Sequence, residues 1–186
     1  MEDWFTADQH FYHDNIIKYC NRPFNSLPEM HEEIIGNWND CVTKHDRVFV
    51  LGDFAFCNGV EQEKIEKLLK ALRGQKFLIR GNHDRAPVTH ARGWNWVKDL
   101  DKISTHGQEI VLCHYAMRVW RNSYHGSWAL YGHSHSTLPD DVTSLSTDVG
   151  VDRWRFKPVN YEILKNLFAN RVFKAVDYHV RKEDGV

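Results

Sequence analysis

Five short blocks of Asp, Asn and His residues stand out in this sequence because together they could hold metal ions. They are Asp8-Gln9-His10, Gly52-Asp53, Gly81-Asn82-His83-Asp84, His114 and Gly132-His133-Ser134-His135. Carboxylate, amide and imidazole groups suit divalent first-row transition ions. Two such ions about 3.5–4 Å apart are a recurring arrangement in enzymes that hydrolyse phosphate esters. The blocks therefore predict a two-metal hydrolase.

Three of these blocks follow short apolar segments that read as strands. Residues 4–7 lead into Asp8, residues 47–51 into Asp53, and residues 76–80 into Gly81. Continuous apolar runs of this length are typical of strands buried on both faces. Because open α/β sheets bind ligands beyond the carboxyl ends of their strands, we expect the blocks to meet at one edge of a sheet.

The remaining segments predict helices around the first strands and a mainly β second half. Apolar residues at helical spacing indicate helices at 26–42, 60–72 and 160–169. Short strand-like runs lie at 94–97, 102–105, 109–113, 128–131, 143–149 and 172–180. These pieces indicate an α/β protein in which two sheets pack face to face with helices outside.

Length and composition are those of one ordinary globular domain, covering residues 1–186. With 42% hydrophobic residues, 26% charged residues and a net charge of −1, the chain has no basic excess that would attract nucleic acid globally. The first residues lack the basic and apolar pattern of a leader peptide, and no apolar run is long enough to span a membrane, so we expect neither a leader nor a membrane partner. Four scattered cysteines without a C-x-x-C pair favour a reducing compartment and a cytoplasmic location.

The order D-x-H, G-D, G-N-H-D, H and G-H-x-H resembles the calcineurin-like metallophosphoesterases over residues 8–135. Further segments at 13–17, 21–24 and 148–152 resemble a small single-domain subgroup found in bacteria and phages. The resemblance implies a four-layer αββα sandwich, with two mixed sheets flanked by helices.

The same resemblance assigns seven metal ligands and a group of catalytic residues. Asp8, His10 and His135 would bind the first ion, Asn82, His114 and His133 the second, and Asp53 would bridge the two. Two divalent ions are implied, with manganese favoured and iron, zinc, nickel or cobalt also compatible with these ligands. A hydroxide held between them would attack phosphorus. Asn82 would stabilise the developing charge.

His83 is expected to act as a general acid beside the leaving-group oxygen. Asp84 would orient its imidazole and raise its pKa through a hydrogen bond. Gly52, Gly81 and Gly132 would relieve crowding where the backbone turns beside the metals.

Substrate contacts are expected from His13 and from the segment at residues 118–128, which mixes cations with aromatic residues. Arg118 and Arg121 could grip a second phosphate, and Trp120 could stack on a base. His13 could line the site or orient a ligand. The alternative for this segment is that its aromatics pack a loop against the core. For Arg22, loop surface is the favoured interpretation.

The predicted function is metal-dependent hydrolysis of phosphodiesters, with small nucleotides, cyclic phosphodiesters or nucleic-acid ends as substrates. Within the same class, the alternative is a phosphomonoesterase or protein phosphatase. From another class, the alternative is a metal-binding or nucleotide-binding sensor without turnover. The presence of both His83 and Asp84 favours an enzyme.

Overall fold

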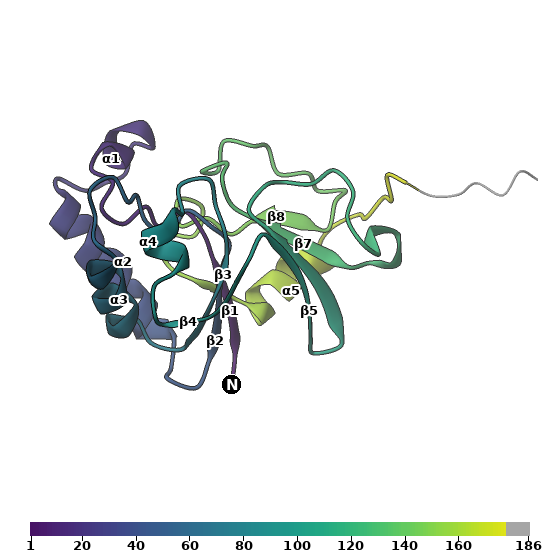
Figure 1. Cartoon of the computed structure of the whole chain (residues 1–186). Helices are drawn as coiled ribbons and strands as arrows, with labels where there is room; N and C mark the ends of the chain where they lie inside the picture. The colour runs from purple at the N-terminus through teal and green to yellow at the C-terminus, as the bar shows by residue number, and fades with distance from the viewer. Residues whose placement is uncertain (178–186) are drawn as a thin grey trace, which may run out of the picture.

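The computed structural model describes residues 1–177, which form two β-sheets packed face to face (Figure 1). The first sheet has the strand order β4-β3-β2-β1-β9. Its strands are β1 (Asp3–Thr6), β2 (Arg47–Val50), β3 (Gln75–Ile79), β4 (Trp94–Lys98) and β9 (Val159–Asn160). Four of them run parallel, and β9 pairs antiparallel with β1.

The second sheet has four strands in the order β5-β6-β7-β8. They are β5 (Leu100–Thr105), β6 (Gln108–Cys113), β7 (Trp128–Tyr131) and β8 (Ser146–Asp148). β5 is antiparallel to β6, whereas β6, β7 and β8 are parallel. Both sheets are therefore mixed, which confirms the predicted α/β class.

Helices α1 (Asn15–Tyr19), α2 (Leu27–Cys41), α3 (Gln62–Ala71) and α4 (Ala86–Thr89) lie on the side of the first sheet that faces away from the second (Figure 1). α2 begins where the sequence predicts. The Ser26 side chain accepts a hydrogen bond from the backbone N–H of Glu29 at 3.3 Å, and proline follows at the start of the helix. Such a cap satisfies an N–H that the first helical turn leaves free.

Alternate side chains of β2 belong to two different hydrophobic clusters. Val48 and Val50 pack toward the helices, in a cluster with Trp38 of α2. Phe49 belongs to the other cluster, which fills the space between the sheets with Ile110 of β6 and other apolar residues. Since successive side chains of a strand point to opposite faces, β2 is buried on both sides, as its continuous apolar run predicts.

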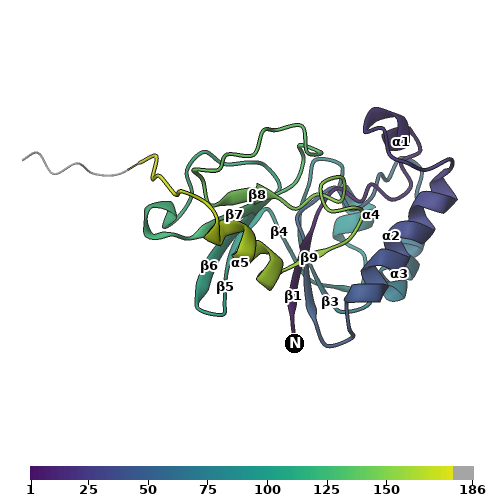
Figure 2. The same cartoon turned by 180° about the vertical axis from the view of Figure 1, so that it is seen from behind.

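The last helix, α5 (Tyr161–Ala169), completes the core between the sheets, and Figure 2 shows it beside β7 and β9. Its residues Leu164 and Phe168 are buried there, and Tyr161 stacks on Trp128 with ring centroids 5.3 Å apart. The outer face of the second sheet is covered by a smaller cluster of Val111, Ala129 and a loop tryptophan, Trp120, which precedes the short 3₁₀-helix Ser123–His125.

Two predicted strands differ in the structure. The run at 143–149 forms a strand only over Ser146–Asp148. Residues 172–177 form no strand, and the preceding Arg171 holds the chain beside β8 through side-chain hydrogen bonds to the carbonyls of Ser144 and Ser146. The rest of that predicted strand, residues 178–180, lies outside the described residues.

Strand register brings the ligand blocks to one edge. Thr6, Val50 and Leu78 are side by side in the parallel part of the first sheet, so the chain leaves all three strands at the same level. In the second sheet, His114 follows β6 and Gly132 follows β7, and the Gly132 N–H donates to the His114 carbonyl at 3.0 Å. Among residues 1–177, none of the helices combines the length and apolar character needed to span a bilayer.

Candidate metal centre

Asp53 lies at the centre of the site, with its side chain only 2% exposed. Its Oδ2 atom is 3.5 Å from His10 Nε2 and 3.4 Å from His114 Nε2. Its Oδ1 atom accepts a hydrogen bond from the backbone N–H of His83 at 2.8 Å. One carboxylate oxygen thus faces a histidine from each of the two ligand sets that the sequence predicts.

The first ligand cluster consists of Asp8, His10 and His135, whose ligand atoms lie within 4.8 Å of one another. Asp8 Oδ2 and His10 Nε2 are buried and have no hydrogen-bond partner within the described part of the chain. Buried polar atoms normally have a hydrogen-bond partner, so two neighbouring acceptors without one are suited to binding a cation. A divalent cation fits this donor set of one carboxylate and two imidazoles.

The second ligand cluster consists of Asp53, His114 and His133. Asn82 completes it, because its Oδ1 atom lies 3.1 Å from His114 Nε2 and 3.0 Å from His133 Nδ1. His114 Nδ1 lies 2.8 Å from the carbonyl of Leu51, so Nδ1 carries a proton and Nε2 is the atom that this ring can offer to a metal ion. These groups converge on one point and also fit a divalent cation.

Burial shapes the electrostatics of the first cluster. It raises the pKa of Asp8 to about 7 and lowers the pKa of His10 to about 2. Both shifts disfavour the charged forms, as expected for groups removed from water. A bound dication would favour the ionised Asp8 and the neutral His10, which are the forms that bind metal.

The shared carboxylate is ionised. Burial alone would raise the pKa of Asp53, but the hydrogen bond and charge of His114 outweigh it and bring that pKa down to about 2. For His135, burial opposes protonation, yet the hydrogen bond to Asp152 raises the pKa to about 10. Asp53 is thus available as an anionic bridge at neutral pH.

Five of the predicted ligands have backbone dihedral angles in the left-handed region. Positive φ angles occur at Asp8 (60°), His10 (52°), Asp53 (53°), His133 (67°) and His135 (46°). This region is uncommon for residues other than glycine and costs of order 1–3 kcal/mol at each position. Its concentration at the ends of several different strands shows that the fold holds these side chains in strained positions that converge on one site.

Glycines let the ligand loops approach one another, as the sequence predicts. A Cβ atom on Gly52, where φ is +92°, would collide with His114 Nδ1 and lie 2.7 Å from the Cα atom of Gly81. A Cβ on Gly132 would lie 2.5 Å from the Cβ of Ala7 and 2.9 Å from Asp8 Oδ2. Real Cβ atoms do not tolerate such contacts, so the loops can approach this closely only with glycine at positions 52 and 132.

Asp84 does not orient His83, and that expectation is wrong. The Asp84 side chain is buried, and its Oδ2 accepts from the backbone N–H groups of Asp53 (2.8 Å) and Gly81 (2.9 Å). Its Oδ1 accepts from Phe54 at 2.9 Å. Within residues 1–177 no hydrogen bond joins Asp84 to the His83 imidazole. Burial raises the Asp84 pKa to about 6, and the carboxylate ties the 52–55 loop to the 81–84 loop.

His83 itself lies beside the first cluster. Its ring centroid is 5.1 Å from that of His10, and a ligand atom of its ring lies within 4.8 Å of those of His10 and Asp53. Its backbone is fixed by the hydrogen bond to Asp53 described above. The imidazole is therefore close enough to the site to act on a substrate oxygen or to bind metal.

His13 also lies against the first cluster. Its Nδ1 atom is 3.2 Å from His10 Nδ1, and its ring stacks on Phe56 with centroids 4.3 Å apart and planes 16° apart. It is 5.9 Å from the His83 ring. The structure thus places His13 where it can both hold His10 and line the site, the two roles expected for it.

Trp120 is not available for base stacking, so that expectation is wrong. It is only 9% exposed, packs on Val111 and Ala129, and donates from Nε1 to the Ser127 carbonyl at 3.1 Å. For this residue the packing alternative holds. Within the described residues, no hydrogen bond or ion pair joins Arg118 or Arg121 to a metal ligand. Arg118 instead lines a separate hollow of about 370 Å³.

Sequence reasoning missed a buried ion pair behind the first cluster. Asp152 Oδ2 lies 2.7 Å from His135 Nδ1, and Asp152 receives hydrogen bonds from Arg22 Nε (2.8 Å) and Nη2 (2.9 Å). Arg22 also donates to the carbonyls of Asp8 (2.7 Å) and Gln9 (2.9 Å). Being 4% exposed, Arg22 is a support of the ligand loops and not loop surface. The only signals were the 21–24 and 148–152 segments, both noted for their resemblance.

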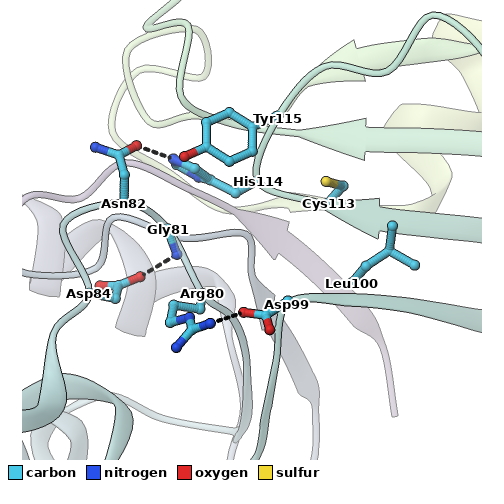
Figure 3. Close-up of a pocket in the computed structure, with 9 residues that line it drawn as sticks. All are labelled: Arg80, Gly81, Asn82, Asp84, Asp99, Leu100, Cys113, His114 and Tyr115. Carbon is cyan, nitrogen blue, oxygen red and sulfur yellow. Dashed lines mark hydrogen bonds and ion pairs between the residues drawn. The ribbon is translucent and has the colours of Figure 1, made fainter.

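A cavity of about 570 Å³ opens beside the second cluster (Figure 3). It reaches from Asn82 and His114 past Tyr115 to an ion pair between Arg80 and Asp99. Its volume lies in the range of sites that bind small molecules. Substrate therefore has room next to the predicted ligands.

Several known proteins are similar to this chain in sequence or in fold. The uncharacterized protein MJ1445 of Methanocaldococcus jannaschii is 32% identical over 169 residues, covering 88% of this chain and 89% of that protein. The Gene 66 protein of a Mycobacterium phage is 28% identical over 81% of this chain and 88% of its own length. A solved structure from Aquifex aeolicus, described as a protein of unknown function, AQ665, has the same fold. Its TM-score is 0.69 at 22% identity, with 89% of this chain and 98% of that chain covered.

A family model extends over most of the chain. Residues 4–154, which contain all seven predicted ligands, match the model for the calcineurin-like phosphoesterases. The chain therefore belongs to the calcineurin-like phosphoesterase family.

Proposed function

We propose that this protein is a dinuclear-metal phosphoesterase that hydrolyses phosphodiesters of nucleotides or of nucleic-acid ends. The observation that carries the proposal is the position of Asp53, whose Oδ2 lies between His10 and His114 at 3.5 and 3.4 Å. It joins two clusters of donors, one of which contains buried acceptors that have no hydrogen-bond partner among residues 1–177. Family membership supports the phosphoester part of the proposal.

The first ion would be held by Asp8, His10 and His135, the second by Asn82, His114 and His133, and Asp53 would bridge them. When bound, two dications lower the pKa of water, polarise the phosphoryl group and offset its charge. Manganese is the proposed occupant, and the mixed O and N donors also accept iron, zinc, nickel or cobalt.

The chain's own residues supply the remaining chemistry. Asn82 directs its Oδ1 toward His114 and His133, so its Nδ2 group is free to donate to a phosphoryl oxygen. His83 is proposed to protonate the leaving oxygen. Its backbone is held by Asp53, and its ring lies beside His10 and His13. His13 is proposed to position His10 through the contact between their Nδ1 atoms.

A small substrate fits the open cavity beside Asn82 and His114. A nucleotide or a strand end can reach this cavity without opening the fold. All four cysteines are free thiols, which agrees with the proposed location in a reducing cytoplasm.

The test is a substrate panel with metal-stripped protein. Bis-p-nitrophenyl phosphate, p-nitrophenyl phosphate, 2′,3′-cyclic nucleotides and a phosphopeptide are assayed after addition of Mn²⁺, Ni²⁺, Zn²⁺ or Mg²⁺. The proposal expects metal-restored hydrolysis that prefers diesters. Preference for p-nitrophenyl phosphate or the phosphopeptide would instead establish a phosphomonoesterase or a protein phosphatase. Stoichiometric metal binding without any hydrolysis would identify a sensor.

A further inference from the structure

The cavity beside the second cluster has two chemically different walls (Figure 3). One wall is formed by Leu100 and Cys113 and by the ring of Tyr115. Leu100 is 52% exposed and Tyr115 is 49% exposed, so both present free apolar surface to the cavity. The other wall carries the ion pair of Arg80 and Asp99, 2.6 Å apart.

The Arg80–Asp99 pair can be exchanged for another anion. Both side chains are largely exposed, at 52% and 75%, and an ion pair in water contributes little to stability. A guanidinium group binds phosphate through two parallel hydrogen bonds, which suits it to a phosphate oxygen pair. Arg80 can therefore release Asp99 and take a phosphate without disturbing the fold.

The charged wall continues into a neighbouring hollow of about 260 Å³. The two hollows share Arg80 and Asp99, and the second adds the side chains of His90 and Lys98. Lys98, whose Nζ atom pairs with Asp101 Oδ2 at 2.9 Å, thus places a further cationic side chain beyond Arg80. Arg80 and the predicted ligand Asn82 line the same cavity, so one substrate can contact both.

We infer that this cavity binds the part of the substrate beyond the reacting phosphate, and that this part is a nucleoside carrying a further phosphate. The base or sugar would pack on Tyr115 and Leu100, and the additional phosphate would replace Asp99 on Arg80. The inference deepens the proposed function and depends on it for the position of the reacting phosphate. A nucleoside polyphosphate and a nucleic-acid strand share this chemistry, so the experiment contains a probe for each.

Asp99 provides a specific test of the inference, because substitutions of Arg80 and of Asp99 should change nucleotide affinity in opposite directions. Removing the charge of Arg80 takes away the phosphate ligand. Removing the charge of Asp99 frees the same guanidinium from its competitor and removes a repelling carboxylate. A purely structural ion pair would instead give the same loss from either side.

The experiment measures dissociation constants by calorimetry with the manganese-loaded protein. The probes are α,β-methylene-ADP, a phosphorothioate hexathymidylate and inorganic phosphate, the first two chosen because they resist hydrolysis. The variants are Arg80→Gln and Asp99→Asn. Arg92→Gln is the matched control, because Arg92 is an exposed arginine paired with Glu66 in a different hollow.

We expect Arg80→Gln to weaken one or both nucleotide probes by about tenfold and Asp99→Asn to tighten the same probe by about threefold. Arg92→Gln should change neither. Inorganic phosphate takes the place of the reacting phosphate at the metal ligands and has no second phosphate for Arg80, so it should bind all variants equally. An effect on α,β-methylene-ADP alone identifies a free nucleotide, and an effect on hexathymidylate alone identifies a strand. The inference is overturned if Arg80→Gln matches Arg92→Gln for both probes, or if Asp99→Asn weakens them as Arg80→Gln does.

Hydrolysis of bis-p-nitrophenyl phosphate, which has no second phosphate, separates this inference from the proposed function. If wild type and Arg80→Gln hydrolyse this substrate equally and also bind the nucleotide probes equally, the proposed function stands and the inference is wrong. If the wild type hydrolyses nothing but nucleotide affinity still depends on Arg80 and Asp99, the inference stands and the proposed function is wrong.

Discussion

The Nδ1 atom of His135 lies 2.7 Å from Oδ2 of Asp152, at the back of the first ligand cluster. Arg22 holds the other side of the Asp152 carboxylate and also binds the carbonyl of Asp8. One buried ion pair thus fixes the imidazole of one predicted ligand and the backbone of another. Because Nδ1 is engaged by Asp152, Nε2 is the atom that His135 can offer to a metal.

Replacing Asp152 should therefore weaken metal binding without removing a ligand. We expect Asp152→Asn to lower the affinity for the first Mn²⁺ by about 10–100-fold, the effect usual for a carboxylate that orients a ligating histidine. Calorimetric titration of metal-stripped protein measures this affinity. Asp40→Asn, at an exposed position near the end of α2, is the control and should bind as the wild type does. Equal affinities in the two variants would refute this role for Asp152.

Loss of His83 should depend on the leaving group. Since p-nitrophenolate leaves readily without a proton, His83→Ala should affect bis-p-nitrophenyl phosphate much less than a dinucleoside phosphate. For the dinucleoside phosphate we expect a loss of about 10²–10⁴-fold in kcat, the usual contribution of a general acid. Metal content should remain at the wild-type level. A loss of bound metal would show that His83 is a ligand, and exposed His45→Ala serves as the control.

Two glycine substitutions should have opposite consequences. A Cβ on Gly81 would collide with the backbone nitrogen and Oδ1 of Asp53, so Gly81→Ala should displace the bridging carboxylate and destabilise the protein by about 1–3 kcal/mol. Gly36 lies inside α2 with nothing within 4 Å of a Cβ, so Gly36→Ala should stabilise by about 0.5–1 kcal/mol. Urea unfolding and metal titration check both. A Gly81→Ala variant that binds metal normally would contradict the close packing of these loops.

His31 should make stability fall in acid. Its Nε2 accepts the backbone N–H of Tyr12 at 2.9 Å, and burial lowers its pKa from 6.5 to about 4. Between these two values the unfolded chain binds a proton that the folded protein does not, so the unfolding free energy rises with pH and is lost as pH falls from 6.5 toward 4.

The matching variant is His31→Gln, which retains an acceptor without titrating. Between pH 7 and pH 4 it should lose up to about 3 kcal/mol less unfolding free energy than the wild type. Urea unfolding of both proteins at a series of pH values gives the difference. Parallel losses in the two proteins would exclude His31 as the source.

The sequence predicts that the ligand blocks meet in space, because each block follows a strand whose apolar run is easy to recognise. Parallel strands bring their carboxyl ends to one edge, so position along the chain translates directly into position in space. The long helices are predicted for a similar reason, since α2 has a cap at Ser26 and a clear apolar stripe. α4 spans only four residues, too few for any periodicity to show.

What the sequence could not predict are side-chain directions and distant pairs. Asp84 is adjacent to His83, yet the turn aims its carboxylate at the backbone of Asp53 and Phe54. Trp120 lies on a loop of the right composition for substrate binding but packs against the second sheet. Arg22 and Asp152 are 130 residues apart, so no local pattern joins them.

The most direct test of the two-metal account is the number of Mn²⁺ ions bound per chain, measured by elemental analysis alongside hydrolysis of bis-p-nitrophenyl phosphate. The account predicts that activity follows the filling of two ions per chain in the wild type. It also predicts that Asp53→Ala, which lacks the shared carboxylate, loses both the second ion and the activity. One ion per chain at full activity, or an Asp53→Ala variant as active as the wild type, would contradict it.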